Sequence, residues 1–312
     1  MLPEQCVSFR NPEGHLLRGI LHPPSPDRKR GVSVLLLNTG LNDMTGWHRV
    51  QVKLARHLAR LGYAVLRFDD AGIGDSEGDI PDESIVKIFA RIESGLFVPD
   101  ALAAVDFMVG RFSEDRLVCI GFCGGGVTAV HAAAGDTRIC GMVDVGGPVT
   151  LSSEEHLQKT DPWEARNHVR SYRAKIFQIG PWIRFLSGGK DYGTVFRSLL
   201  HYLRHLIGGR YREPPKGRAA ENDNPRNLNR LFFSSFEKYA RSMRPLLFYF
   251  AELDAATWEF KKHFLNRYKP SPLWSDSLFR FVEIQKANHI FSDPDSREQM
   301  KRDLVDWLRR FD

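Results

Sequence analysis

The chain has 312 residues, 42% of them hydrophobic and 26% charged, so it can bury a large core as one large domain or two small ones. Its formal net charge of +6 is mildly basic. The basic clusters are not interleaved with a stacking motif, and no nucleic-acid-binding signature occurs, so we expect a solvated basic face and no nucleic-acid partner.

The first half of the chain alternates predicted strands with predicted helices. Apolar and polar residues alternate around a turn in residues 7–24, which is typical of a hairpin. Apolar runs that end in glycine predict buried strands, and apolar residues at helical spacing predict helices. With their following turns, the strands cover residues 31–40, 64–78, 116–122 and 139–148, and the helices cover 49–63, 97–112 and 125–135. This order predicts an α/β fold with a mainly parallel, doubly wound sheet.

The alternation breaks between about Leu151 and Arg241, where the segments are helical and rich in aromatic residues. It returns with strands in residues 244–254 and 278–291 and a helix in residues 296–311. We therefore predict a core in two parts, residues 1–150 and 242–312. A helical cap, residues 151–241, is inserted after the sixth strand. A Gly- and Pro-rich polar stretch predicts a mobile loop near residues 208–225.

The cysteines and the N-terminal residues indicate a reduced cytoplasmic protein. Four cysteines without a CxxC pair do not form a disulfide framework or a zinc motif, and no metal site or organic cofactor is indicated. The N-terminal residues show no basic start followed by an apolar stretch, so no secretory signal is expected. Apolar runs are too short to span a bilayer. The oligomeric state is not indicated.

Residues 118–130, VCIGFCGGGVTAV, place Cys123 in a glycine cluster between a predicted strand and a predicted helix. The segment fits the Gly-x-nucleophile-x-Gly turn, in which Gly121 and Gly125 are small because larger side chains there would collide. Such a turn presents Sγ at the positive end of the next helix, which favours the thiolate. The spacing does not fit a GxGxxG phosphate-binding loop. An inert buried thiol is the alternative for Cys123, as it is for Cys119 in mid-strand.

A nucleophile of this type requires a histidine and an acid, which follow it in the order nucleophile, acid, histidine. Asp254 ends the strand of residues 244–254, and His289 follows the next strand. We predict that Cys123 attacks a carbonyl carbon, that His289 carries protons, and that Asp254 fixes the imidazole tautomer.

Alternatives exist for the acid and the histidine. Glu252 lies two residues before Asp254, on the same face of the predicted strand, and Asp144 follows the preceding strand. His48 and His131 are the main alternatives to His289, although His131 lies in the middle of a predicted helix.

Acyl chemistry also needs donors for an oxyanion. The first predicted donor is the backbone N–H of Gly124, the residue after the nucleophile. The second is the N–H of Leu41, in the loop after the first parallel strand, where Gly40 lets the backbone turn; the N–H of Gly40 is the alternative. Trp47 and His48 follow closely and are predicted, together with Gly40, to line the substrate pocket.

With these parts the chain resembles the α/β-hydrolase superfamily, in its serine-aminopeptidase-like branch. The resemblance lies in NTG (38–40), RFDDAGIGDSEG (67–78), GFCGG (121–125), AELD (251–254) and NHIFSDPD (288–295). Within the branch it is most similar to the hydrolases associated with the exosortase A system. Those are similar in the cysteine at the elbow, in the residues from Asp254 to Phe260, and in the segment His289–Ser292. The resemblance implies an α/β-hydrolase fold.

Three functions follow from this reading. The first is hydrolysis of an ester or thioester, free or carrier-bound, through an acyl-enzyme on Cys123. The second is acyl transfer or cyclisation, because a thioester intermediate is readily attacked by amines and thiols and an alcohol or internal hydroxyl can also take the acyl group. The third is a non-catalytic binding protein with a hydrolase fold, which the complete set of nucleophile, acid and histidine disfavours.

Overall fold

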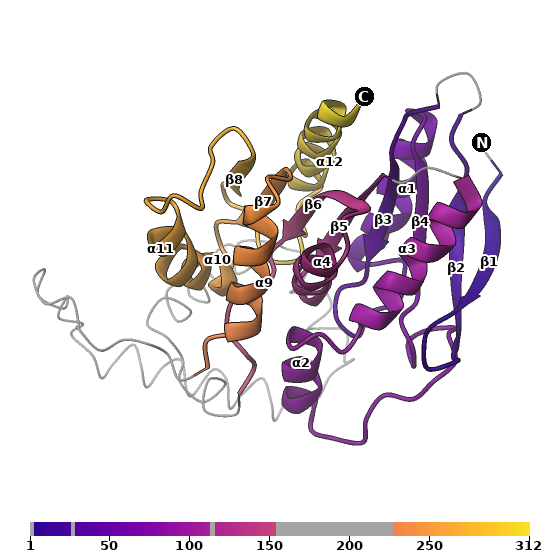
Figure 1. Cartoon of the computed structure of the whole chain (residues 1–312), viewed down its shortest axis with the longest axis horizontal. Coiled ribbons are helices and arrows are strands. Elements are labelled where there is room, and N and C mark those ends of the chain that lie inside the picture. The colour runs from indigo at the N-terminus through magenta and orange to yellow at the C-terminus, as the bar shows by residue number, and fades with distance from the viewer. Residues whose placement is uncertain (1–2, 26–28, 113–115, 154–226) are drawn as a thin grey trace, which may run out of the picture. The chain divides into compact units, whose positions relative to one another are not determined.

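The computed structural model describes residues 3–25, 29–112, 116–153 and 227–312 (Figure 1). The chain divides into two compact units, one of residues 1–159 with 227–312 and the other of residues 160–226. Most of the predicted cap, including the predicted loop near 208–225, lies outside the described residues. The fold and the site below therefore belong to the first unit.

Eight strands form one sheet in the order β1-β2-β4-β3-β5-β6-β7-β8. The β1–β2 and β2–β4 pairs are antiparallel, and the other neighbouring strands are parallel. This confirms the predicted mainly parallel sheet with an N-terminal hairpin. The strands are β1 (Gln5–Arg10), β2 (Leu16–His22), β3 (Ser33–Leu37), β4 (Ala64–Phe68), β5 (Leu117–Phe122), β6 (Ile139–Val145), β7 (Leu246–Ala251) and β8 (Phe279–Ile284).

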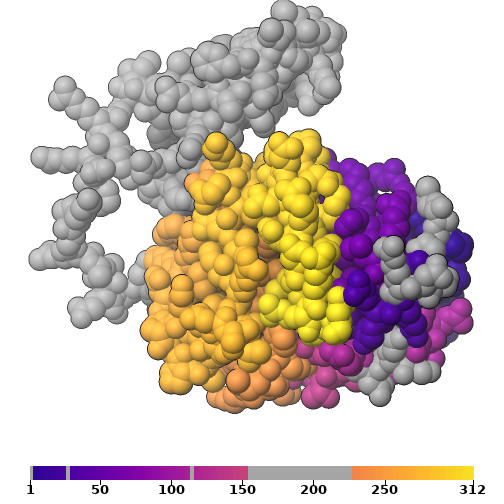
Figure 2. Space-filling view, turned by 90° about the horizontal axis from the view of Figure 1, so that it is seen from above, coloured from indigo at the N-terminus to yellow at the C-terminus, as the bar shows by residue number. Residues whose placement is uncertain are grey.

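Helices cover both faces of the sheet, because successive residues of a buried strand point to opposite sides. On one face, Leu36 and Val143 belong to the core that includes α1 (Val50–Arg60) and α12 (Pro294–Leu308). The C-terminal residues, in yellow, adjoin the violet N-terminal half in Figure 2. The other face packs on α3 (Val98–Phe112), α4 (Gly124–Gly135) and α9 (Arg230–Arg241).

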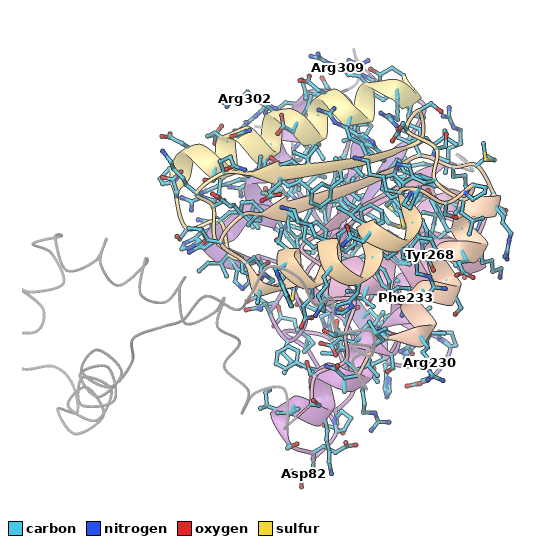
Figure 3. All side chains as sticks on the ribbon, turned by 90° about the vertical axis from the view of Figure 1, so that its left-hand side faces the viewer. Asp82, Arg230, Phe233, Tyr268, Arg302 and Arg309 are labelled. Carbon is cyan, nitrogen blue, oxygen red and sulfur yellow. The ribbon has the colours of Figure 1, made fainter. Side chains whose placement is uncertain are left out.

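Helix α9 lies within the range predicted for the cap, yet it packs in the core of the sheet unit. Phe232, Phe236 and Tyr239 are fully buried there. Phe233 of α9 lies 6.0 Å from Tyr268, measured between ring centroids, and Figure 3 labels both. The end of the predicted cap range therefore contributes to the core against which β7 and α4 pack.

Among the described residues, the remaining helices are short, except for α2 (Ile85–Glu93), a helix that is absent from the sequence prediction. They are η2 (Trp47–Arg49), α10 (Ala255–Glu259), the π-helix η3 (Phe260–Leu265), α11 (Asn266–Tyr268) and η4 (Arg309–Phe311). In the described part of the chain, no helix combines the length and the apolar character needed to cross a membrane.

Candidate active site

Cys123 lies between β5 and α4 with φ 51° and ψ −118°. A positive φ is rare for a residue with a side chain and costs on the order of 1–3 kcal/mol. It persists only where the surrounding structure holds the residue in place. Here the Cys123 N–H donates to Val145 O of β6 at 2.8 Å, and Cys123 O accepts from Gly126 N at 2.9 Å. The backbone therefore has the strained strand-to-helix turn that the GFCGG segment predicts.

The glycines around Cys123 are required because a side chain at their positions would collide with backbone atoms or with a buried carboxylate. A Cβ on Gly121 would lie 2.0 Å from Gly125 O, and one on Gly125 would lie 2.1 Å from Asn38 O. A Cβ on Gly126 would lie 2.0 Å from Asp144 Oδ1, so the last glycine of the cluster makes room for that carboxylate. The close packing of β5, α4 and the end of β3 thus requires all three glycines.

Asp254 and His289 meet at the carboxyl ends of β7 and β8. His289 Nδ1 lies 2.7 Å from Asp254 Oδ2. Asp254 is also the N-cap of α10, where its Oδ1 accepts from Ala256 N at 3.1 Å. The carboxyl group is buried, whereas a third of the His289 side chain is exposed. The acid is therefore fixed by a helix cap while the imidazole stays accessible.

Interactions with Asp254 and Cys123 govern the charge of His289. Burial lowers its pKa, but hydrogen bonds and charge interactions with both residues outweigh burial, and its pKa stands well above the usual value for histidine. The imidazole thus interacts with both the carboxylate of Asp254 and the thiol of Cys123. Cys123 itself is half-buried.

The alternative acids make other contacts. Glu252 Oε2 accepts from the backbone N–H of Lys286 at 2.7 Å. Asp144 is fully buried behind the turn at Cys123 and accepts from Gly147 N at 2.8 Å. Burial raises the pKa of Asp144 to about 7, although that hydrogen bond lowers it. Of the three candidate acids, Asp254 is the one that contacts His289.

The alternative histidines lie apart from this contact. His131 is buried in α4 between Ser235 Oγ at 2.9 Å and Glu93 O at 3.2 Å, and burial lowers its pKa. It is therefore a neutral core histidine with a partner on each ring nitrogen. His48 is exposed in η2 and has a left-handed backbone, with φ 51°.

Gly40 and Gly124, which belong to the predicted oxyanion segments, are adjacent. Gly40 has φ +62°, and a Cβ built on Gly124 would lie 3.4 Å from Gly40 Cα. Gly124 is the first residue of α4, so its N–H has no intrahelical acceptor. Leu41 packs in a small apolar cluster with α2.

The segment after β4 holds the loop that contains Leu41 and Trp47. Asp69 Oδ1 accepts from Met44 N at 2.6 Å, and its Oδ2 accepts from Asp75 N at 3.2 Å. Burial raises the pKa of Asp69, and these two hydrogen bonds oppose the rise. Within the RFDDAGIGDSEG segment, Asp69 thus holds the turn after β4 and binds the loop after β3.

Trp47 and α2 form walls of the site. The Trp47 ring contacts His289 edge-on, with the centroids 4.9 Å apart, so this predicted pocket residue lies at the site. Phe89 would be 3.0 Å from a Cβ on Gly40, and Ile92 would be 2.9 Å from one on Gly124. Sequence reasoning missed these α2 residues, although Ile85, Ile88, Phe89 and Ile92 recur at helical spacing.

Glu93, the last residue of α2, connects this wall to the start of the predicted cap range. Its two carboxylate oxygens accept from Ser152 N at 2.6 Å and Ser152 Oγ at 2.7 Å. Burial raises the pKa of Glu93 to about 7, although the Ser152 hydrogen bonds lower it. Its carbonyl accepts from Asn229 Nδ2 at 2.6 Å, so residues from the first and the last described parts of the predicted cap range both contact Glu93.

Nothing at this site is arranged like a metal centre. In residues 3–25, 29–112, 116–153 and 227–312, no group of three or more His, Cys, Asp or Glu side chains could hold an ion.

Comparison with solved structures identifies the fold as that of the α/β hydrolases. The serine hydrolase XC6422 from Xanthomonas campestris, described as lacking a lid, is 14% identical with a TM-score of 0.54, covering 100% of this chain and 96% of that one. The Pyrococcus furiosus esterase Pf2001 is 16% identical with a TM-score of 0.57, covering 99% and 93%. The α/β hydrolase GrgF from Penicillium sp. sh18 is 16% identical with a TM-score of 0.57, covering 99% of each.

Residues 31–243 match the family described as serine aminopeptidase, S33. The chain belongs to this family, which confirms the predicted branch of the α/β-hydrolase superfamily. A search of curated proteins finds no match. The family description names a serine, whereas the residue at the turn between β5 and α4 here is Cys123.

Proposed function

We propose that the protein hydrolyses an ester or thioester through a covalent acyl intermediate on Cys123. The thiolate attacks the carbonyl carbon, and the protonated His289 gives its proton to the leaving group. His289 then takes a proton from water, and the resulting hydroxide adds to the acyl carbon. The C–S bond breaks, the carboxylic acid leaves, and the Cys123 thiolate is regenerated beside the protonated His289. Asp254 holds the imidazole in one tautomer throughout.

The 2.7 Å contact between His289 Nδ1 and Asp254 Oδ2 carries this proposal. It leaves Nε2 as the nitrogen that exchanges a proton with Cys123. The adjacent Gly40 and Gly124 support an oxyanion site in which the N–H groups of Gly124 and Leu41 are the donors. Trp47 supports a substrate pocket beside the imidazole.

The likeness to the exosortase A system-associated hydrolases is part of the proposal. Two residues of the similar segment contact neighbouring parts of the sheet unit: Thr257 contacts the end of β7, and Glu259 contacts the segment after β6. Thr257 Oγ1 donates to Ala251 O at 2.6 Å, and Glu259 Oε2 accepts from Thr150 Oγ1 at 2.5 Å. These contacts favour a subgroup in which the segment after the acid is adapted to hold it.

The test is incubation with short acyl thioesters and nitrophenyl esters, followed by intact-mass and peptide analysis. We expect an acyl adduct on Cys123 and loss of turnover in Cys123→Ala and His289→Ala. Intact turnover in either variant would refute the mechanism. Adding amines or alcohols separates hydrolysis from acyl transfer, since transfer would produce the acceptor's amide or ester instead of the free acid.

A further inference from the structure

The loop between β8 and α12, which contains His289, has two residues in left-handed conformations. Lys286 has φ 61° and Phe291 has φ 46°, and neither is a glycine. Such conformations are unfavourable for residues with side chains and persist when other contacts hold them. His289 lies between these two positions in the loop. The contacts that hold Lys286 and Phe291 therefore also help to place the imidazole.

Each of the two left-handed positions is held by a charged side chain from outside the loop. Glu252, after β7, accepts the backbone N–H of Lys286 at 2.7 Å. Arg297, in α12, donates from Nη1 to Phe291 O at 2.7 Å and to Ser292 O at 2.8 Å. Hydrogen bonds with one charged partner are stronger than neutral ones, so both can hold a strained backbone.

We propose that Glu252 and Arg297 are positioning residues that together hold His289 between Asp254 and Cys123. This inference rests on the proposed function. Glu252 lies two residues before Asp254, and between them Leu253 N donates to Ala287 O at 2.8 Å. The acid and histidine loops are thus joined at Glu252, Leu253 and Asp254, while Arg297 fixes the far side of the histidine loop.

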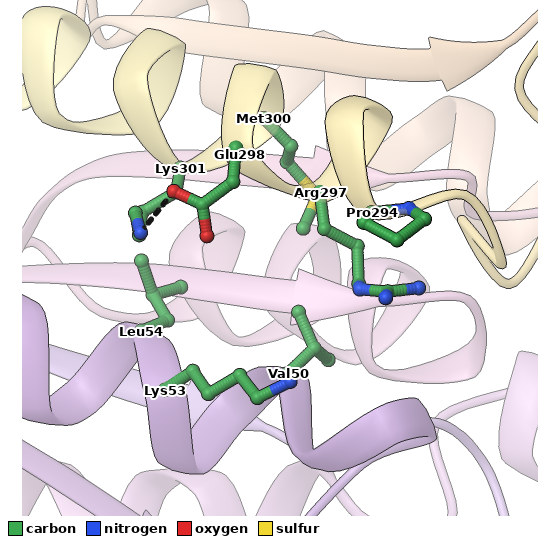
Figure 4. A pocket seen from close by; sticks show the side chains of 8 residues that line it. All are labelled: Val50, Lys53, Leu54, Pro294, Arg297, Glu298, Met300 and Lys301. Carbon is green, nitrogen blue, oxygen red and sulfur yellow. Dashed lines mark ion pairs between the residues drawn. The ribbon is translucent and has the colours of Figure 1, made fainter.

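The surroundings of Arg297 allow its side chain to be shortened. Its half-buried side chain lines a cavity of about 120 Å³ between α1 and α12 (Figure 4). A smaller side chain therefore enlarges an existing open space rather than creating a void in the core. Glu252 is half-buried as well, so substitutions at both positions are expected to fold.

The experiment measures the rate at which iodoacetamide alkylates Cys123 between pH 5.5 and 9, with peptide mapping to separate Cys123 from the other cysteines. This rate depends on the imidazolium beside the thiol and needs no knowledge of the substrate. In Glu252→Ala and Arg297→Met we expect alkylation at pH 6 to fall by on the order of tenfold relative to pH 9, because a displaced imidazole no longer favours the thiolate.

Conservative variants and a matched control separate positioning from stability. Glu252→Gln keeps an acceptor and Arg297→Lys keeps a cationic donor, so each should recover much of the alkylation at pH 6. Arg302→Met removes an exposed arginine from the same helix and should match the wild type (Figure 3). All variants are compared at equal folded fraction, judged by circular dichroism.

Wild-type alkylation profiles in folded Glu252→Ala and Arg297→Met would overturn the proposal. So would equal losses in the alanine and glutamine variants of Glu252, since a positioning role predicts rescue. His289→Ala separates a failure of the proposed function from a failure of the positioning role. If it leaves the profile unchanged, the proposed function fails; if it alters the profile while the positioning variants do not, only this inference fails.

Discussion

Asp254 binds two N–H groups with its two carboxylate oxygens: the imidazole of His289 at 2.7 Å through Oδ2 and the backbone of Ala256 at 3.1 Å through Oδ1. The same residue is therefore both the partner of the histidine and the N-cap of α10. A substitution at this position can separate the two roles.

Asp254→Asn should reduce kcat/KM while leaving stability nearly unchanged. Asparagine is as good an N-cap as aspartate, so α10 keeps its cap. Its amide can no longer fix the productive tautomer, and the loss of kcat/KM is expected on the order of 10²–10⁴. Ester hydrolysis and thermal unfolding measure the two quantities, with the exposed Asp295→Asn as control. A loss below about threefold would contradict the role of Asp254.

Gly125→Ala should destabilise the protein, because the new Cβ would lie 2.1 Å from Asn38 O, a backbone atom that cannot move alone. We expect a decrease in the free energy of unfolding of about 2 kcal/mol or more. Gly110→Ala in α3 is the matched control, since its Cβ meets nothing within 4 Å. That change should stabilise by about 0.5–1 kcal/mol. Urea unfolding of both variants tests the pair, and similar values would contradict the packing argument.

The turn at Cys123 could be predicted from sequence because its determinants are local. A strand, a glycine two residues on each side and a helix all lie within residues 116–135. Whether Glu252 or Asp254 is the acid depends on where β7 ends and the chain turns. Glu252 and Asp254 would share a face if β7 continued, but β7 ends at Ala251. Glu252 then bonds to Lys286 N and Asp254 to His289.

Other features depend on contacts between distant segments. The need for glycine at position 126 is explained only by the carboxylate of Asp144 in β6. No local sequence pattern places that carboxylate behind α4. The wall formed by Phe89 and Ile92 does not depend on distant contacts. Its signals are local, because apolar residues recur at helical spacing and Ser84 precedes them as N-cap, so this helix could have been predicted from the sequence. The proposed role of Glu252 and Arg297 rests on the left-handed backbone at Lys286 and Phe291, and the sequence does not show these conformations.

Asp144→Asn should remove a pH dependence of stability. Burial raises the pKa of Asp144 to about 7, above its usual value near 3.8. Between these values the folded protein retains a proton that the unfolded chain has lost, so the stability that the group contributes at low pH is lost as pH rises toward 7. Asparagine does not titrate, and relative to wild type the variant should gain about 2–4 kcal/mol between pH 4 and 8. Urea unfolding at both pH values tests this, and a pH-independent difference would contradict it.

Trp47→Ala should reduce kcat/KM, because the indole contacts the His289 ring with centroids 4.9 Å apart. An aromatic pair of this kind contributes about 0.5–1.5 kcal/mol beyond the area it buries, which corresponds to a loss of roughly three- to tenfold. Trp47→Phe keeps an aromatic edge and should remain within about twofold of wild type. Lys53→Ala, an exposed change in α1, is the control. Because the indole acts on the imidazole, the loss should fall mainly on kcat; an effect confined to KM would instead make Trp47 a substrate contact alone.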